Sequence, residues 1–142
     1  MVIVSQLLDV KGRRVFSIAP DESVLRAMQV MAAEEIGALL VMDRGELLGV
    51  LSERDYARKV ILMNRSSRDT PVRDIMTSPV LTVQPADSVQ HCMQLMTERR
   101  VRHLPVVAAG KVEGLLSIGD LVKALLQDQS DQIQQLQRYI AG

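Results

Sequence analysis

The chain has 142 residues, of which 47% are hydrophobic and only 2% aromatic, and 17 basic side chains balance 17 acidic ones. Such a neutral, aromatic-poor chain is not typical of nucleic-acid binders, which carry a basic excess or aromatic side chains that stack on bases. No apolar run reaches the roughly 18–20 residues of a membrane span, and the N-terminus lacks the basic segment and cleavage site of a signal peptide. We therefore expect a cytoplasmic protein that binds neither nucleic acid nor membrane.

Residues 15–61 predict one β-α-β-β-α unit. A strand at residues 15–19 is followed by Pro20 and an acidic residue, which is a favourable helix start. Two apolar runs, residues 38–42 and 47–51, indicate a hairpin joined by a short polar turn. The helix between the first strand and the hairpin has one apolar face, formed by Val24, Ala27, Met28 and Met31.

The same unit occurs a second time. When the sequence is shifted by 65 positions, it matches itself without a gap from residue 15 to residue 61. The second unit is therefore expected to have a strand at residues 80–84, a helix with Cys92 on its buried face, and a second hairpin. The paired identities include Val15/Val80, Pro20/Pro85, Ser23/Ser88, Met28/Met93, Leu39/Leu104, Gly49/Gly114, Ser52/Ser117 and Asp55/Asp120.

The repeat predicts a mixed α+β fold. One unit of about 50 residues would bury too little surface to be stable alone, so we expect the two repeats to pack through their sheets about a pseudo-twofold axis. The predicted segments are a first repeat with an N-terminal segment at 1–63, a linker at 64–71, a second repeat at 72–127, and a helical tail at 128–142.

The tail, which begins near residue 127, has Ile133, Leu136 and Ile140 on one stripe and a polar, Gln-rich opposite face. Two roles fit this stripe: it covers the core of its own chain, or it binds a partner. We expect packing on the core, because that is the more common role of an apolar helix face.

The most informative local pattern is Gly, two aliphatic residues, Ser, two variable residues and Asp, at residues 49–55 and again at 114–120. Ser at a helix N-cap with an acid three residues later forms a capping box, which is the simpler interpretation. The same helix N-terminus presents free N–H groups that attract phosphate, and a nearby carboxylate accepts hydrogen bonds from ribose hydroxyls. The Gly allows a ligand to approach the backbone closely. The pattern therefore also suits a ribose that carries phosphate.

This pattern, the β-α-β-β-α repeat and the ungapped duplication resemble the pair of cystathionine-β-synthase (CBS) domains known as a Bateman module, over about residues 7–126. The runs SERDYARKV, TPVRDIMTS and SIGDLVK are similar to those of stand-alone CBS-pair proteins of proteobacteria. The resemblance implies a regulatory protein that binds AMP, ADP or ATP, with NAD(H) or S-adenosylmethionine as alternatives. It also implies a homodimer that signals to an unknown regulated protein by a conformational change.

By this resemblance, the Ser of each motif contacts phosphate and the Asp contacts the ribose, in two clefts between the repeats. One cleft would combine Ser117 and Asp120 with a base side formed by Gly12, Ser17, Ile36 and Gly37. The other would combine Ser52 and Asp55 with Thr77, Thr82, Val101 and Arg102.

The residues beside the two motifs differ. Arg54 lies where the second motif has Gly119, and Arg102 and His103 replace Gly37 and Ala38 of the first repeat. These three residues are candidate phosphate ligands, because phosphate favours Arg. Their alternative roles are a solvated helix residue for Arg54 and a structural hydrogen-bonding residue for His103, and Lys11 could equally be a surface charge.

An enzyme is not expected. The chain lacks the G-x-S-x-G, H-E-x-x-H, C-x-x-C and Walker patterns, and it is too short for a catalytic barrel of about 250 residues. No metal site or catalytic cofactor is expected either. The alternatives are a structural dimerisation module with idle clefts, which the two intact Asp residues disfavour, and a nucleic-acid binder or hydrolase, which the neutral charge and missing motifs disfavour.

Overall fold

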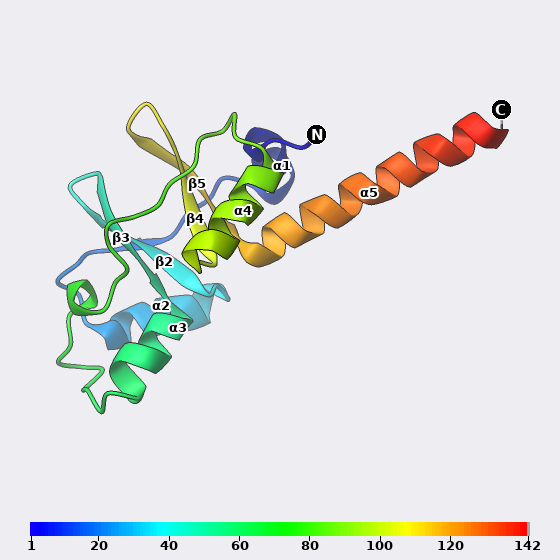
Figure 1. Cartoon of the computed structure of the whole chain (residues 1–142). Coiled ribbons are helices and arrows are strands. Elements are labelled where there is room, and N and C mark those ends of the chain that lie inside the picture. Colours follow the sequence, from blue (N-terminus) through cyan, green and yellow to red (C-terminus); the bar gives the residue numbers. More distant parts are fainter. Residues whose placement is uncertain (142) are drawn as a thin grey trace. The chain divides into compact units, whose positions relative to one another are not determined.

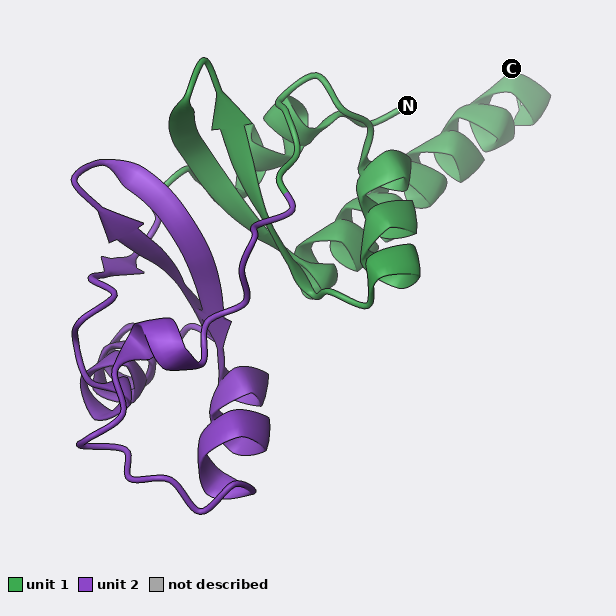
Figure 2. Ribbon diagram, turned by 60° about the vertical axis from the view of Figure 1, so that its left-hand side comes forward, with its two compact units in different colours: residues 1–14, 82–142 green, residues 15–81 purple. Residues whose placement is uncertain are grey.

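The computed structural model describes residues 1–141 and contains two compact units (Figure 2). Unit 1 combines residues 1–14 with the chain from residue 82 onward, and unit 2 consists of residues 15–81. These units are bounded differently from the predicted segments: residues 1–14 lie in the unit that contains most of the second repeat, and residues 72–81 lie in the unit that contains the first. Gly142, the end of the predicted tail, lies outside the described residues.

Unit 2 is built on a three-stranded sheet in the order β1-β2-β3, with β1 parallel to β2 and β2 antiparallel to β3 (Figure 1). The helix α2 buries Val24, Ala27 and Met31 in its aliphatic core, as its apolar face predicts. The elements in chain order are β1 (Ser17–Ile18), α2 (Val24–Glu34), β2 (Ala38–Asp43), β3 (Glu46–Ser52), α3 (Glu53–Tyr56), the π-helical η1 (Ala57–Ile61) and the 3-10 turn η2 (Val72–Asp74).

Unit 1 contains an antiparallel hairpin, β4-β5, with helices around it. Cys92 is fully buried on α4, as predicted, and its burial together with the nearby Asp87 raises the pKa of its thiol to about 11. The elements are α1 (Val4–Lys11), α4 (Val89–Arg99), β4 (His103–Ala108), β5 (Lys111–Ser117) and α5 (Ile118–Ala141). The predicted mixed α+β fold with two repeats is confirmed.

The shift of 65 positions holds in the backbone as well as in the sequence. Ser23 and Ser88 cap α2 and α4 by accepting a hydrogen bond from the N–H three residues later. Both helices then end in a left-handed residue, Glu35 or Arg100, and each hairpin has its irregularity at the same place. Local signals such as caps and turns therefore fix the same structure twice.

The first strand of each repeat is shorter than predicted. Only two residues of the predicted strand at 15–19 pair with β2, and in unit 1 only Val83 bridges to β4. The N–H of Leu40 donates to the Phe16 carbonyl over 3.0 Å. The counterpart of Leu40 in β4 is Pro105, which has no N–H to donate. The second copy therefore lacks the equivalent bond to Leu81, on the N-terminal side of Val83.

Backbone hydrogen bonds explain why residues 1–14 lie in unit 1 and residues 72–81 lie in unit 2. In unit 1, the N–H of Val4 at the start of α1 donates to the Asp87 carbonyl over 2.8 Å. In unit 2, the N–H of Val72 at the start of η2 donates to the Glu22 carbonyl, also over 2.8 Å. Buried backbone groups need hydrogen-bond partners. The segment with α1 finds them in the second repeat, and the segment with η2 finds them in the first repeat.

The last helix of each repeat differs most between the copies. After α3, unit 2 makes the π-helical η1, in which the Leu62 N–H donates to the Ala57 carbonyl over 3.0 Å. In unit 1, α5 instead runs without a break for 24 residues, so the predicted tail is not a separate helix (Figure 1). The predicted packing of its distal stripe on the core is wrong, because Ile133, Leu136 and Ile140 are exposed. No helix among residues 1–141 is both long and apolar enough to cross a membrane.

Candidate functional site

Both sequence motifs form a capping box, one in each unit. In unit 2 the Ser52 N–H donates to Asp55 Oδ2 over 2.9 Å, and the Asp55 N–H donates to Ser52 Oγ over 3.2 Å. In unit 1 the Ser117 N–H donates to Asp120 Oδ2 over 2.8 Å, and the Asp120 N–H donates to Ser117 Oγ over 3.1 Å. The simpler interpretation of the motif is confirmed. It also fixes a hydroxyl and a carboxylate side by side at each helix N-terminus.

The carboxylate of Asp55 is held on both oxygens, and its side chain is 13% exposed. Ser52 Oγ donates to Oδ2 over 3.1 Å, and Thr77 Oγ1 donates to Oδ1 over 3.3 Å. Lys59, four residues along the same helical segment, places its Nζ 3.1 Å from Oδ1. Thr77 was predicted to line the base side of this cleft. Within unit 2 it hydrogen-bonds to Asp55, the residue predicted to bind the ribose.

The carboxylate of Asp120 is paired with a lysine from the other end of the chain. Lys11 Nζ, in the last turn of α1, lies 2.5 Å from Asp120 Oδ2 and also contacts the Leu115 carbonyl. Burial raises the pKa of Asp120, but the hydrogen bonds from Lys11 and the Ser117 N–H together outweigh it and hold this pKa below its ordinary value. The Asp120 side chain remains 24% exposed. Lys11 is therefore part of the site and not simply a surface charge.

The Lys11→Met variant is expected to lose an acid-sensitive part of the stability of unit 1. Because the pKa of Asp120 lies below its unfolded value of about 3.9, the pair stabilises the folded chain above that value and loses this contribution as the pH falls through the folded pKa. Urea unfolding of both chains at several pH values measures the effect. The stability difference should be present at neutral pH and shrink in acid.

Lys111→Met is the matched control, because Lys111 begins β5 and is exposed. It should leave the pH profile of stability unchanged. A difference between Lys11→Met and the natural chain that stays constant from neutral to acid pH would contradict the role given to the Lys11–Asp120 pair.

The two motif glycines are required by packing inside each unit. A Cβ on Gly49 would lie 2.7 Å from Met76 Sδ and 3.0 Å from the Thr77 carbonyl oxygen. A Cβ on Gly114 would lie 2.7 Å from Leu8 Cδ2. We expected these glycines to admit a ligand. The structure corrects this: the neighbouring segment of the chain, η2 with its following residues or α1, already fills the space.

The predicted base-side residues are divided between the units. Gly12 lies in unit 1 with Asp120, as the C-cap of α1 with φ of 100°, whereas Ser17, Ile36 and Gly37 lie in unit 2. For the other predicted cleft, Thr77 shares unit 2 with Asp55. The remaining members of that set, Thr82, Val101 and Arg102, lie in unit 1.

Gly37 and Arg102 occupy equivalent places in the two repeats. The Gly37 carbonyl accepts the N–H of Glu53 over 3.1 Å, and the Arg102 carbonyl accepts the N–H of Ile118 over 2.9 Å. Each residue thus ties the start of the hairpin to the first residue of the helix that carries the Asp. Arg54 is the second residue of α3, and His103 is the first of β4, next to Arg102.

A hollow of about 340 Å³ lies within unit 2 and includes two of the predicted base-side residues, Ile36 and Gly37. Its other lining residues are Met28, Met31, Ala32, Glu35 and Glu53. The lining thus combines apolar side chains with two carboxylates, those of Glu35 and Glu53. Residues 1–141 contain no group of three His, Cys, Asp or Glu side chains placed to hold a metal ion.

Comparison with known proteins places this architecture in a family. A profile of the CBS domain matches residues 8–62 and 72–127, which together make up most of the chain. The chain belongs to the CBS domain family. Both capping boxes lie within the matched residues, so each CBS repeat carries one Ser–Asp pair.

Two relatives that are more than 40% identical to this chain support the resemblance to stand-alone CBS pairs. A CBS-domain protein from Burkholderia ambifaria MC40-6, named as a candidate signal-transduction protein, is 48% identical, with a TM-score of 0.86 over 90% of this chain and 96% of that one. CBSX3, a mitochondrial CBS-domain protein of Arabidopsis thaliana, is 42% identical over 127 residues. The match covers 86% of this chain but only 62% of the Arabidopsis protein.

A more distant solved structure shares the fold alone. The CBS pair of protein MJ0100 was solved in complex with 5′-methylthioadenosine and S-adenosyl-L-methionine. It is 22% identical to this chain, with a TM-score of 0.80 over 90% of this chain and 98% of that one.

The pairing of Lys59 with Asp55 has a local signal in the sequence that was not used in the prediction. Lys59 is four residues from Asp55, the spacing at which opposite charges meet on a helix. The pairing of Lys11 with Asp120 had no such signal, because the two residues are 109 positions apart.

Proposed function

We propose that this CBS pair is a regulatory protein that binds a ligand with an adenosine moiety, preferably AMP, ADP or ATP, and catalyses no reaction. The observation that carries the proposal is the pair of Ser–Asp capping boxes. Each places a partly accessible carboxylate, a good acceptor for the two ribose hydroxyls, beside a hydroxyl and a helix N-terminus that favour phosphate. The complex of the MJ0100 pair supports adenosine as the shared part of the ligand.

The lysines favour a ligand that carries phosphate. In each unit an ammonium group contacts the carboxylate, Lys11 at Asp120 and Lys59 at Asp55. Ribose hydroxyls that donate hydrogen bonds to the carboxylate would compete with the lysine for its oxygens. A phosphate group of the ligand would then supply another anion for the lysine. 5′-Methylthioadenosine has no negative charge, and S-adenosylmethionine has one carboxylate but two cationic groups, an ammonium and a sulfonium, so both should bind more weakly than AMP at these sites.

Regulation requires a difference in affinity between two states. A ligand shifts a conformational equilibrium only by as much as it binds one state better than the other. The ligand would therefore favour one conformation of the pair, and the regulated partner would bind that conformation.

Thermal unfolding with a panel of compounds tests the function. A ligand that binds only the folded chain stabilises it by about 2.7 kcal/mol at a hundredfold excess over its Kd. AMP, ADP or ATP should raise the Tm, with 5′-methylthioadenosine, S-adenosylmethionine and NAD(H) weaker. If no adenine compound raises the Tm at millimolar concentration, the proposal is wrong and a structural dimerisation module remains.

A further inference from the structure

α5 carries a row of apolar side chains along its length that face solvent in unit 1. The row consists of Val122, Leu126, Ile133, Leu136 and Ile140, with Gln129 at its one polar position. The five apolar side chains are between 43% and 82% exposed, and Tyr139 beside them is 86% exposed. Exposed apolar rows of this extent are typical of interaction surfaces.

The spacing of the row is that of a coiled coil. From Val122 to Ile140 its members are separated by steps of four and three residues in alternation. This is the heptad pattern with a mean period of 3.5 residues, which keeps one seam of a helix facing a second helix. A surface helix that packs on its own core usually has a broader apolar face.

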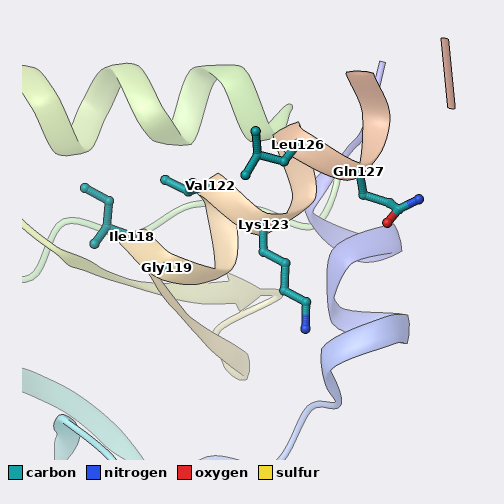
Figure 3. A pocket seen from close by; sticks show the side chains of 6 residues that line it. All are labelled: Ile118, Gly119, Val122, Lys123, Leu126 and Gln127. Carbon is teal, nitrogen blue, oxygen red and sulfur yellow. The ribbon is translucent and has the colours of Figure 1, made fainter. Parts of the chain in front are cut away.

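The proximal end of the row is one wall of an open hollow. The hollow has a volume of about 610 Å³, and all six residues that line it belong to α5 (Figure 3). The side chains of Ile118, Val122 and Leu126 point to one side of the helix, and those of Lys123 and Gln127 point to the other (Figure 3). The proximal end of the row therefore borders open space.

The row extends beyond the CBS repeat. The family profile ends at residue 127, and α5 continues to Ala141 with the alternation of four and three unchanged. A 24-residue helix is about 36 Å long. Its distal part is therefore a feature of this chain that the fold of the CBS pair does not require.

We propose that α5 pairs with α5 of a second copy of this chain as a parallel, two-stranded coiled coil. The five apolar side chains of the row are between 43% and 82% exposed, so a second helix along the row would remove apolar surface from water at every turn of α5. A self-complementary row needs no other protein, because each apolar position meets its own counterpart across a twofold axis.

Gln129 selects the parallel orientation. In a parallel, in-register pair, Gln129 faces Gln129 of the other copy, so the two side-chain amides can hydrogen-bond to each other. In an antiparallel pair centred between Ile133 and Leu136, Gln129 faces Ile140, and its amide is buried without a partner. A polar residue at one seam position is a known means of fixing the register of a coiled coil. The flanking residues Leu125, Ser130, Gln132 and Gln137 bring no like charges together in the parallel pair.

Light scattering coupled to gel filtration tests the pairing on the full chain, whose mass is 15.8 kDa. The variant Leu136→Asp should have half the molar mass of the natural chain at the same concentration. Gln135→Asp introduces the same charge next to it on the outward side of α5 and should keep the natural mass. Circular dichroism should show that both variants are folded, because residue 136 is exposed in unit 1. Gln135→Asp should keep the natural Tm, whereas Leu136→Asp should unfold at a lower Tm because it loses the stabilisation that pairing gives to the folded chain. A monomeric natural chain, or an unchanged mass for Leu136→Asp, would overturn the proposal.

Cysteine cross-linking tests the orientation. In the parallel pair, Gln129→Cys should form a disulfide between copies in the presence of oxidised glutathione, whereas Gln135→Cys on the outward side should not. The natural Cys92 is buried and should not react. If Gln129→Cys stays uncrosslinked while the chain remains associated, the parallel arrangement is wrong. Neither measurement involves a nucleotide, so a failure here is distinct from a failure of the proposed ligand binding.

Discussion

Replacing Leu8 by alanine is expected to lower the free energy of unfolding by roughly 2–5 kcal/mol, the range for large-to-small changes in a core. Leu8 is fully buried in unit 1, and its Cδ2 occupies the place directly above Gly114. The cost has two parts, the lost burial of the side chain and the cavity left between α1 and β5. Urea unfolding followed by circular dichroism measures it.

The double variant tests the contact between Leu8 and Gly114. Gly114→Ala alone should cost about 1–3 kcal/mol, because its methyl group meets Leu8 in a packed core. With Leu8→Ala the same methyl group fills part of the cavity, so the double variant should cost less than the sum of the two single changes. Val10→Ala, on the same helix but 90% exposed, should change stability by no more than about 0.5 kcal/mol. Additive costs would contradict the packing of α1 on β5.

Asp120→Asn and Asp55→Asn are each expected to weaken nucleotide binding at one site by roughly 10- to 100-fold. A hydrogen bond to a charged acceptor contributes about 1.5–3 kcal/mol, and asparagine has one acceptor oxygen in place of two charged ones. Asparagine can still accept the N-cap N–H, so the helix start should survive. Isothermal titration calorimetry with AMP gives both affinity and the number of sites.

The control for these variants is Asp43→Asn. Asp43 ends β2 in the hairpin turn, and it is exposed. It should leave the titration unchanged. The ribose assignment would be refuted if both site variants kept the affinity and stoichiometry of the natural chain. Loss of binding in only one of them would identify the single working site.

The parts of the fold that were predicted correctly depend on residues close together in sequence. Each of these features depends on residues within a few positions of one another: the helix caps Ser23 and Ser88, the hairpins and the Ser–Asp boxes. The 65-residue repeat gives every such signal twice. The one-residue bridge at Val83 also has a local cause, the missing N–H of Pro105. We could have predicted this shortening by comparing Pro105 with Leu40.

The contacts that could not be predicted join distant parts of the chain. Nothing near Gly114 indicates that Leu8 fills the space above it, and nothing near Asp120 indicates Lys11. Periodicity assigns a residue to a face but does not identify what covers that face. The distal stripe of α5 shows the same limit: Ile133 and Leu136 were correctly placed on one apolar side, but the sequence alone could not show that unit 1 leaves it exposed.

The division of unit 1 into residues 1–14 and the chain from residue 82 has a consequence for synthesis on the ribosome. Translation proceeds from the N-terminus, and domains generally fold as units while it does so. Unit 2 is continuous and can fold as soon as residue 81 has emerged. α1 is made before unit 2, yet the carbonyls of Pro85 and Asp87 and the surface of β5 that it packs on are made only after unit 2. The nascent chain must therefore carry α1 without these packing partners until β5 has been translated.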